Sequence, residues 1–339
     1  MGGDPVTVGV NVFIVAINSV SEEDMSFTVN MYFRQSWNDS RLAFEDDEGL
    51  EEIIFGAEKT GEIWKPDTFF VNKKPAKYEG SATDMDTALM IEKDGAILWS
   101  QRMSLTASCP MDLSYYPFDS QLCSLEIESF KYTMSDIKYK WQYVQLSPDV
   151  AYIDMNVLGH RTGTVEAHLK SGNYSRLIAD IAFERASAYY VTHHFLPVGF
   201  LSLLSLAALL IPSQHVTGRL LLGIVPLLAI MYISMIATQK LPNVSYFKAI
   251  DIFMIFHCVL IAVSIFLSIF FAWRDKHAKP SDESNKGVYS SLSTSSKSWL
   301  QAEIISLTVF LIVFITFNII FWCIYGGHQE VVDDLEELF

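Results

Sequence analysis

The sequence predicts an antiparallel β-sandwich followed by a bundle of four transmembrane helices. Residues 1–188 show short strand-like alternation and carry most of the acidic side chains. Residues 189–325 contain long apolar stretches whose interiors have no charged residue. A hydrophobic content of 50% and a mean hydropathy of +0.25 agree with a membrane protein that has a large water-exposed β head and an all-α membrane domain.

Alternating apolar residues predict the strands of the first domain. They run through Val6, Val8, Val10 and Val12, and resume at Phe27, Val29, Met31 and Phe33. Polar turn signals at residues 18–24 and 45–49 separate such segments, and no long helical period interrupts them. Many short strands without helices are typical of a β-sandwich.

Four apolar stretches predict the membrane helices, because about 20 apolar residues in a helix cross a bilayer. They cover residues 193–212, 218–238, 251–273 and 302–325. The Ser-rich residues 274–300 are expected to be a flexible cytoplasmic linker. Basic residues at Arg219 and in 274–279 indicate cytoplasmic connections, so the sandwich and the C-terminal tail, 326–339, are expected outside the cell, at the plasma membrane.

Composition and motifs exclude several classes of function. A net charge of −15 argues against a nucleic-acid partner. The eight histidines are scattered, and the sequence has no glycine loop for phosphate, no metal-spaced cluster and no nucleophile elbow. We therefore expect no enzyme activity, no cofactor and no metal site.

Two of the four cysteines, Cys109 and Cys123, lie in the acidic half and frame the string CPMDLSYYPFDSQLC. By itself this pair indicates only an oxidising compartment. Within the string, Tyr116 precedes Pro117, a pair compatible with a cis peptide bond in a tight turn. Cys258 and Cys323 lie in apolar stretches and are expected to be free, buried thiols.

The full string resembles the signature of the Cys-loop family of pentameric ligand-gated ion channels, with Tyr116, Pro117, Phe118 and Asp119 as its centre. Further segments look like blocks of the glycine- and GABA-receptor branch: MYFRQSWNDSRL (31–42), WKPDTFFVN (64–72), LEIESFKYT (125–133) and LPNVSYFKAID (241–251). The resemblance covers nearly the whole chain. It implies a Cys109–Cys123 disulfide and a homopentamer with a small-molecule agonist.

The resemblance also implies an agonist site between adjacent subunits. The principal side would use Phe69, Glu128, Ser129, Phe130 and Tyr174, and the complementary side Tyr32, Arg34, Leu98 and Ser100. Aromatic faces attract an ammonium by a cation–π interaction of about 1–2 kcal/mol. Glu128 would pair with that ammonium and Arg34 with a carboxylate. Such a site suits a zwitterionic, amino-acid-like transmitter.

A charged joint is expected to couple the sandwich to the helices. In the family, the arginine at the position of Arg185 meets acids of the first β-turn and the Cys loop, here Glu22, Glu23 and Asp119. The loop from Pro242 to Lys248 would receive the movement. The alternative is a solvated ion pair without a special role.

The second apolar stretch has two interpretations. At helical spacing, one stripe contains Leu221, Val225, Leu228, Tyr232, Met235 and Gln239. Taken alone, it is compatible with a lipid-facing anchor helix. The resemblance makes it the pore helix, with Thr217 and Arg219 at the cytoplasmic end and Leu228 as the gate. Arg219 is expected to face neighbouring helices or the inner mouth, and Pro226 to disturb the helix.

Gly218 bears on which ion the pore would pass, because it stands where cation-selective relatives carry glutamate. This favours anions such as chloride. Leu221, Val225 and Leu228 offer no hydroxyl group, which predicts low conductance. Two hypotheses therefore stand: a ligand-gated channel subunit that favours anions, and a non-conducting or orphan receptor subunit with the same fold. Membrane lipid is a partner in both, and sequons predict N-glycans at Asn38 and Asn173.

Overall fold

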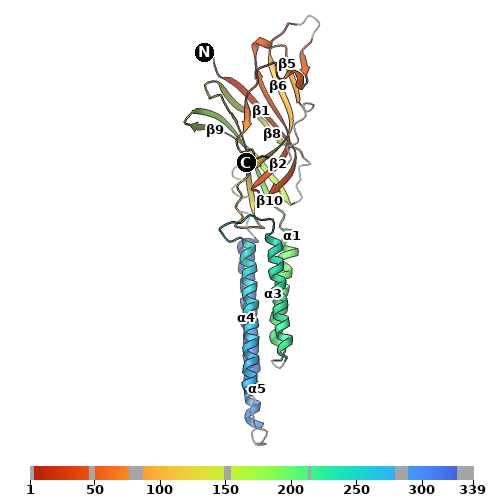
Figure 1. Cartoon of the computed structure of the whole chain (residues 1–339), viewed down its shortest axis with the longest axis vertical. Coiled ribbons are helices and arrows are strands. Elements are labelled where there is room, and N and C mark those ends of the chain that lie inside the picture. The colour runs from red at the N-terminus through yellow and green to blue at the C-terminus, as the bar shows by residue number, and fades with distance from the viewer. Residues whose placement is uncertain are drawn as a thin grey trace. The chain divides into compact units, whose positions relative to one another are not determined.

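The computed structural model describes residues 4–45, 50–75, 87–148, 154–212, 215–278 and 289–326. These residues form two compact units (Figure 1). The sandwich unit comprises the described residues up to Asp112 and from Ser120 to Arg185. The helical unit comprises Leu113–Asp119 and the described residues from Ala186 onward. The acidic residues 46–49 and the tail beyond Gly326 lie outside the described residues.

Two sheets make up the described part of the sandwich unit. One has the strand order β3 (Glu52–Phe55), β5 (Thr87–Glu92), β6 (Ala96–Ser108), β2 (Ser26–Asn38), β1 (Val6–Ser21) and β8 (Ile137–Leu146). The other has the order β4 (Thr68–Phe70), β7 (Ser120–Ser129), β10 (Gly172–Arg185) and β9 (Met155–Leu169).

One strand pair departs from the predicted antiparallel architecture. β8 pairs with β1 in parallel, with Val6 opposite Ile137, whereas the other described pairs are antiparallel. The sandwich is therefore mixed. The reason is connectivity: the chain passes through β7 of the other sheet before it returns as β8, and a return of this length permits parallel pairing, which a tight hairpin does not.

The predicted alternation forms the core between the sheets. Val8, Val10 and Val12 of β1 are fully buried, as are Phe27, Val29 and Met31 of β2. β1 continues to Ser21, through residues that the sequence predicted as turn. Register irregularities between Ile14 and Ala16 and between Ile17 and Ser19 accompany this extension. The reversal itself lies around Glu22–Met25, where Met25 has φ 46°.

The helical unit contains four helices long and apolar enough to cross a membrane, within the described ranges. The first span, Ala188–Leu210, joins α1 (Ala188–Tyr190), the π-helical turn η4 (Val191–Phe195), α2 (Leu196–Ala207) and the 3-10 turn η5 (Ala208–Leu210). The others are α3 (Val216–Thr238), α4 (Ala249–Ala278) and α5 (Tyr289–Tyr325). α3 contains Pro226 and remains one continuous helix.

The helix ends correct the predicted boundaries. α4 continues to Ala278 and α5 begins at Tyr289, so both enter the stretch 274–300 that was predicted to be linker. Extension of an existing helix is far cheaper than nucleation of a new one, which allows polar residues to continue it. Residues 279–288 lie outside the described ranges.

Close packing joins the helices. A Cβ added to Gly223 of α3 would lie 2.4 Å from Cγ1 of Ile265 in α4, so the glycine permits a close approach of the two helices. Phe256 of α4 stacks on Phe317 of α5 with ring centroids 3.5 Å apart. Phe253 of α4 also contacts Phe195 of η4, and these two rings are buried. In Figure 1, α4 and α5 accordingly run side by side.

Candidate functional site

An aromatic pair stands at one end of the four-stranded sheet. Phe69 in β4 and Phe130, which directly follows β7, have ring centroids 5.7 Å apart and nearly perpendicular rings. Phe130 is 71% exposed, and Phe69 is half-buried. An aromatic ring this exposed loses contact with water only when something covers it, so the pair is a candidate ligand surface.

Asp67 fixes the chain that carries this pair. One of its carboxylate oxygens accepts a hydrogen bond from Ser129 Oγ at 2.5 Å, and the other accepts one from the backbone N–H of Lys131 at 2.6 Å. Ser129, predicted to contact the ligand, is buried. Its hydroxyl is bonded to Asp67 and so helps to fix the backbone that carries Phe130.

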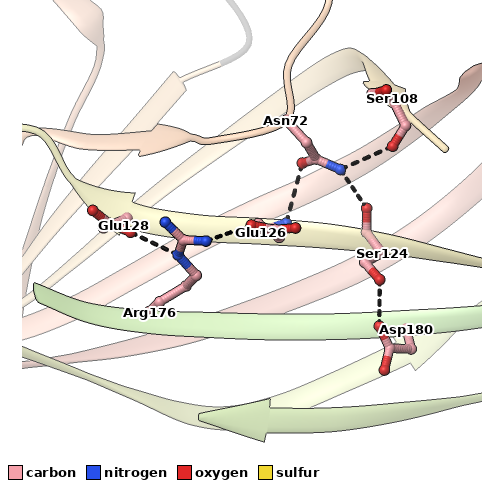
Figure 2. A network of polar contacts seen from close by, with 7 residues as sticks. All are labelled: Asn72, Ser108, Ser124, Glu126, Glu128, Arg176 and Asp180. Carbon is pink, nitrogen blue, oxygen red and sulfur yellow. Dashed lines mark hydrogen bonds and ion pairs between the residues drawn. The ribbon is translucent and has the colours of Figure 1, made fainter. Parts of the chain in front are cut away.

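Glu128, predicted to bind an ammonium, already has a cationic partner. Arg176 of β10 donates from Nε to Glu128 at 2.7 Å and from Nη1 to Glu126 at 2.8 Å (Figure 2). The Glu128 side chain is only 4% exposed. Its charge is therefore paired within the sheet, and its contact with a ligand ammonium stays a prediction.

A wider polar network extends from these carboxylates along β7 (Figure 2). The amide of Asn72 donates to the carbonyl oxygens of Ser108 and Ser124 and accepts from the N–H of Glu126. Ser124 Oγ donates to Asp180, which also pairs with Arg161 at 2.7 Å. These contacts fix the position of β7 and therefore the positions of Glu126 and Glu128.

Tyr174 is another residue predicted to contact the ligand. It lies within β10, is buried, and donates from its hydroxyl to Ser171 Oγ at 3.1 Å. Nearby, the buried Tyr139 hydroxyl hydrogen-bonds to Thr68 of β4 at 2.8 Å. Burial raises the pKa of Tyr139 above its usual value, so this phenol stays neutral. Neither tyrosine offers an open aromatic face.

The predicted complementary residues lie together on neighbouring strands. Arg34 of β2 faces Ser100 of β6 in the register and donates to Ser100 Oγ at 3.4 Å. Its guanidinium lies 5.5 Å from the centre of the Tyr32 ring and donates to the hydroxyl of Tyr143 in β8 at 3.1 Å. Leu98 lies opposite Ser36 in the same strand pair. Sequence reasoning missed Tyr143, because no motif marks it.

Arg185, the last residue of β10, forms a buried ion pair with Glu22 of the β1–β2 turn. The Arg185 side chain is 1% exposed and that of Glu22 is 17% exposed. The predicted alternative partner Glu23 is exposed, and Asp119 is buried in the helical unit. The predicted Arg185–Glu22 contact is thus present.

The Cys109–Cys123 disulfide is formed, and the Tyr116–Pro117 peptide bond is cis. Between the cysteines, Leu113–Asp119 belongs to the helical unit. The backbone N–H groups of Ala249 and Ile250 donate to the carbonyls of Ser114 and Tyr116 at 2.9 and 3.2 Å. The segment is therefore hydrogen-bonded to the start of α4.

The loop that precedes α4 makes a further contact with this segment. The hydroxyl of Tyr246 accepts a hydrogen bond from the N–H of Leu113 at 2.9 Å. Lys248, predicted as a coupling residue, is buried and pairs with Asp251 at 2.7 Å, while Pro242 is half-buried. Tyr246 was missed from the sequence, although the loop that contains it was predicted to take part.

Aromatic residues pack around the tip of the loop between Cys109 and Cys123. Phe118 packs against Phe195 of η4 and Trp322 of α5, with ring centroids 5.6 Å apart in both pairs. Tyr115 lies 5.8 Å from Tyr325, also measured between centroids. The tip is thus held by the outer end of α5 as well as by α4.

The disulfide is expected to be important for stability. It closes a loop with a sequence separation of 14, for which the chain-entropy model gives about 3 kcal/mol. Replacing both Cys109 and Cys123 with serine should lower the melting temperature by roughly 6–12 °C. Thermal unfolding of purified protein measures this, with Cys323→Ser as the control because Cys323 is a free, exposed thiol. An unchanged melting temperature would contradict the prediction.

One face of α3 is open in the single chain. Leu221, Val225, Leu228, Tyr232 and Met235 are all about 60% exposed, and Thr217 and Gln239 are exposed too. The opposite face is buried against the rest of the helical unit and contains Arg219, Gly223, Pro226, Ile230 and Ala237. Arg219 therefore faces neighbouring helices, one of the two positions expected for it, and it pairs with Glu303 of α5 at 2.9 Å.

Two family models match the chain and identify its family. Residues 1–185 match the neurotransmitter-gated ion-channel ligand binding domain, and residues 195–288 match the neurotransmitter-gated ion-channel transmembrane region. The chain belongs to this family of neurotransmitter-gated ion channels. It is not an enzyme.

Relatives of this channel-family chain include three receptor subunits. It is 32% identical to "Gamma-aminobutyric acid receptor subunit beta-like" of Drosophila melanogaster, over 82% of the chain and 59% of the relative. It is 32% identical to "Gamma-aminobutyric acid receptor subunit beta" of Caenorhabditis elegans, over 78% of the chain and 48% of the relative. It is 34% identical to "Gamma-aminobutyric acid receptor subunit beta-4" of Gallus gallus, over 75% of the chain and 52% of the relative. The chain thus spans about half the length of the relatives it matches.

Membership of the channel family also settles the location. The chain is a multi-pass plasma-membrane protein with an extracellular N-terminal domain. Both predicted glycan acceptors, Asn38 and Asn173, are exposed, which their modification requires. Asn173 Oδ1 hydrogen-bonds to His168 Nδ1 at 3.0 Å. Cys323 is exposed in the single chain, which differs from the burial expected from its apolar surroundings.

Proposed function

We propose that the chain is a subunit of a homopentameric ligand-gated ion channel, in which an agonist at subunit interfaces opens a pore lined by α3. The supporting observation is the two-faced character of α3. Its buried face packs within its own subunit, while the stripe from Leu221 to Gln239 has no cover among the described residues. Rotational symmetry would place five such stripes around one axis.

The aromatic pair and the Arg34 surface support an interfacial agonist site. They lie in different sheets, so we propose that Phe69 and Phe130 of one subunit meet Tyr32 and Arg34 of its neighbour. Because Glu128 already forms an ion pair with Arg176, the aromatic faces would hold the ammonium of the ligand. The Arg34 guanidinium would bind its carboxylate. γ-Aminobutyric acid, which appears in the names of the relatives, has both groups and is the first candidate.

Replacing Phe130 with alanine is expected to weaken γ-aminobutyric acid binding about 5- to 30-fold, the equivalent of 1–2 kcal/mol of cation–π attraction. Arg34→Gln should weaken it by at least a similar factor, because it removes a charge-assisted hydrogen bond. Binding can be followed as a ligand-dependent shift of the melting temperature of purified protein.

Leu158→Ala, at an exposed position of β9, serves as the control. Unchanged binding in both site variants would contradict the proposed site. Glycine and primary amines without a carboxylate test the ligand class. If a primary amine without a carboxylate binds, the aromatic pair stays in the proposed site and Arg34 is excluded from it.

We also propose a preference for anions. Gly218, on the first turn of α3, leaves the inner mouth without the carboxylate that cation-selective relatives carry there. Arg219 is turned into the helical unit, so its charge does not carry this proposal. A second candidate function is a non-conducting receptor subunit. It is favoured by the apolar wall that Leu221, Val225 and Leu228 present over the inner half of α3.

A further inference from the structure

Arg219 is the largest fully buried side chain among the described residues. Its Nη2 donates to Glu303 Oε1 at 2.9 Å, and its Nε donates to the carbonyl oxygen of Ile211 at 2.5 Å. Ile211 directly follows η5, the end of the first span. One guanidinium therefore connects the inner ends of three membrane helices.

Glu303 is the only acidic group found within ion-pair distance of Arg219 in the described chain. The Nη1 atom of Arg219 is buried and has no hydrogen-bond partner there. Removing Glu303 would therefore leave a buried guanidinium that only one carbonyl group compensates. A buried charge without its partner destabilises the structure around it.

The position of Glu303 on α5 adds a second consideration. Only 6% of the α5 span is buried in the single chain, less than in the other three spans, and aromatic contacts such as that of Phe317 with Phe256 join it to α4. At its outer end Trp322 and Tyr325 contact the tip of the Cys loop. Near its inner end, Glu303 contacts α3. Two described contact regions therefore link α5 to elements that the proposed function assigns to gating.

We propose that Glu303 is a positioning residue for the pore: its ion pair with Arg219 fixes the inner end of α3, so that α5 restrains movement of the pore helix at the cytoplasmic side. This inference rests on the proposed function in taking α3 as the pore helix. The ion pair also holds the Arg219 charge on the face of α3 opposite the exposed stripe. Glu303 thus acts through Arg219 and does not itself contact permeant ions.

Hydrogen–deuterium exchange of the full chain in lipid nanodiscs tests the proposal. Glu303→Gln should speed amide exchange in residues 216–223 at least tenfold, about 1.4 kcal/mol of local opening. Exchange in residues 230–238, near the outer end of the same helix, should stay within twofold of the unaltered chain. Gln301→Ala, a change at an exposed position two residues before Glu303, is the control and should alter neither segment.

A paired variant keeps the test decisive if Glu303→Gln does not fold. Replacing both Arg219 and Glu303 with methionine removes the unpaired charge, and exchange at 216–223 should then be slower than in Glu303→Met alone. Glu303→Met is measured in the same preparation, and failure of that variant to fold while the double variant folds would support the coupling equally.

The inference is overturned if Glu303→Gln leaves exchange at 216–223 unchanged, or accelerates both segments equally, as a general loss of stability would. Native mass spectrometry of the same samples separates the two proposals. Monomers would refute the pentameric channel, whereas the local exchange pattern reports on the Arg219–Glu303 pair in either state.

Discussion

Replacing Arg185 with glutamine is expected to lower the melting temperature of the protein by roughly 6–20 °C and to reduce the amount that reaches the cell surface. The Arg185 side chain is almost completely buried and forms an ion pair with Glu22. Breaking such a pair from one side costs about 3–5 kcal/mol, because the remaining charge stays buried without compensation. Total stabilities of about 5–15 kcal/mol leave little reserve for such a loss.

Matched variants separate the ion pair from a general charge effect. Glu23→Gln removes a neighbouring but exposed acid and should leave the melting temperature within about 1–2 °C. Glu22→Gln should cost at least as much as Arg185→Gln, because the charge it leaves behind, Arg185, is only 1% exposed, whereas Arg185→Gln leaves Glu22, which is 17% exposed and partly solvated by water. A melting temperature and surface level unchanged in Arg185→Gln would instead identify a solvated ion pair with no special role.

Replacing Leu221 with serine and Val225 with threonine is expected to increase the agonist-evoked current at least tenfold. In the proposed pentamer, two rings of five apolar side chains would become hydroxyl-bearing, while Leu228 would remain as the gate. A narrow apolar constriction excludes water and ions by dewetting, and hydroxyl groups lower that barrier. A tenfold gain corresponds to a barrier lower by only about 1.4 kcal/mol.

Single-channel recording of purified protein in planar bilayers measures this effect. The same recording in a chloride gradient gives the reversal potential and tests the anion preference. Val259→Thr, which adds a hydroxyl to an exposed position of α4, should leave the current unchanged. If the double variant is present in the bilayer as pentamers and conducts no better than the unaltered chain, the apolar wall is not the barrier, and the non-conducting hypothesis loses the observation that favours it.

Local sequence patterns determined the layers, the spans and the family of this protein. The alternation predicted that Val8, Val10 and Val12 share one buried face of β1, because successive residues of a strand point to opposite faces, and only the structure shows that Gly9 and Asn11 between them are buried too. The long apolar stretch of residues 218–238 predicted a spanning helix, and α3 agrees with it to within two residues at its start. The cysteine string identified the loop that the structure packs among the helices. Each of these signals lies within one continuous segment of the chain.

Tertiary structure alone decided the partners of the charged and aromatic residues. Arg176 and Glu128 are 48 positions apart, and strand register determines their pairing, so the sequence could not show that Glu128 is already neutralised. Tyr174 belonged to a polar string, yet its strand places it inside the sandwich. Arg219 and Glu303 are 84 positions apart, and helix packing turns Arg219 away from the exposed stripe. Burial and charge pairing depend on which elements pack together, and periodicity within one element carries no information about that.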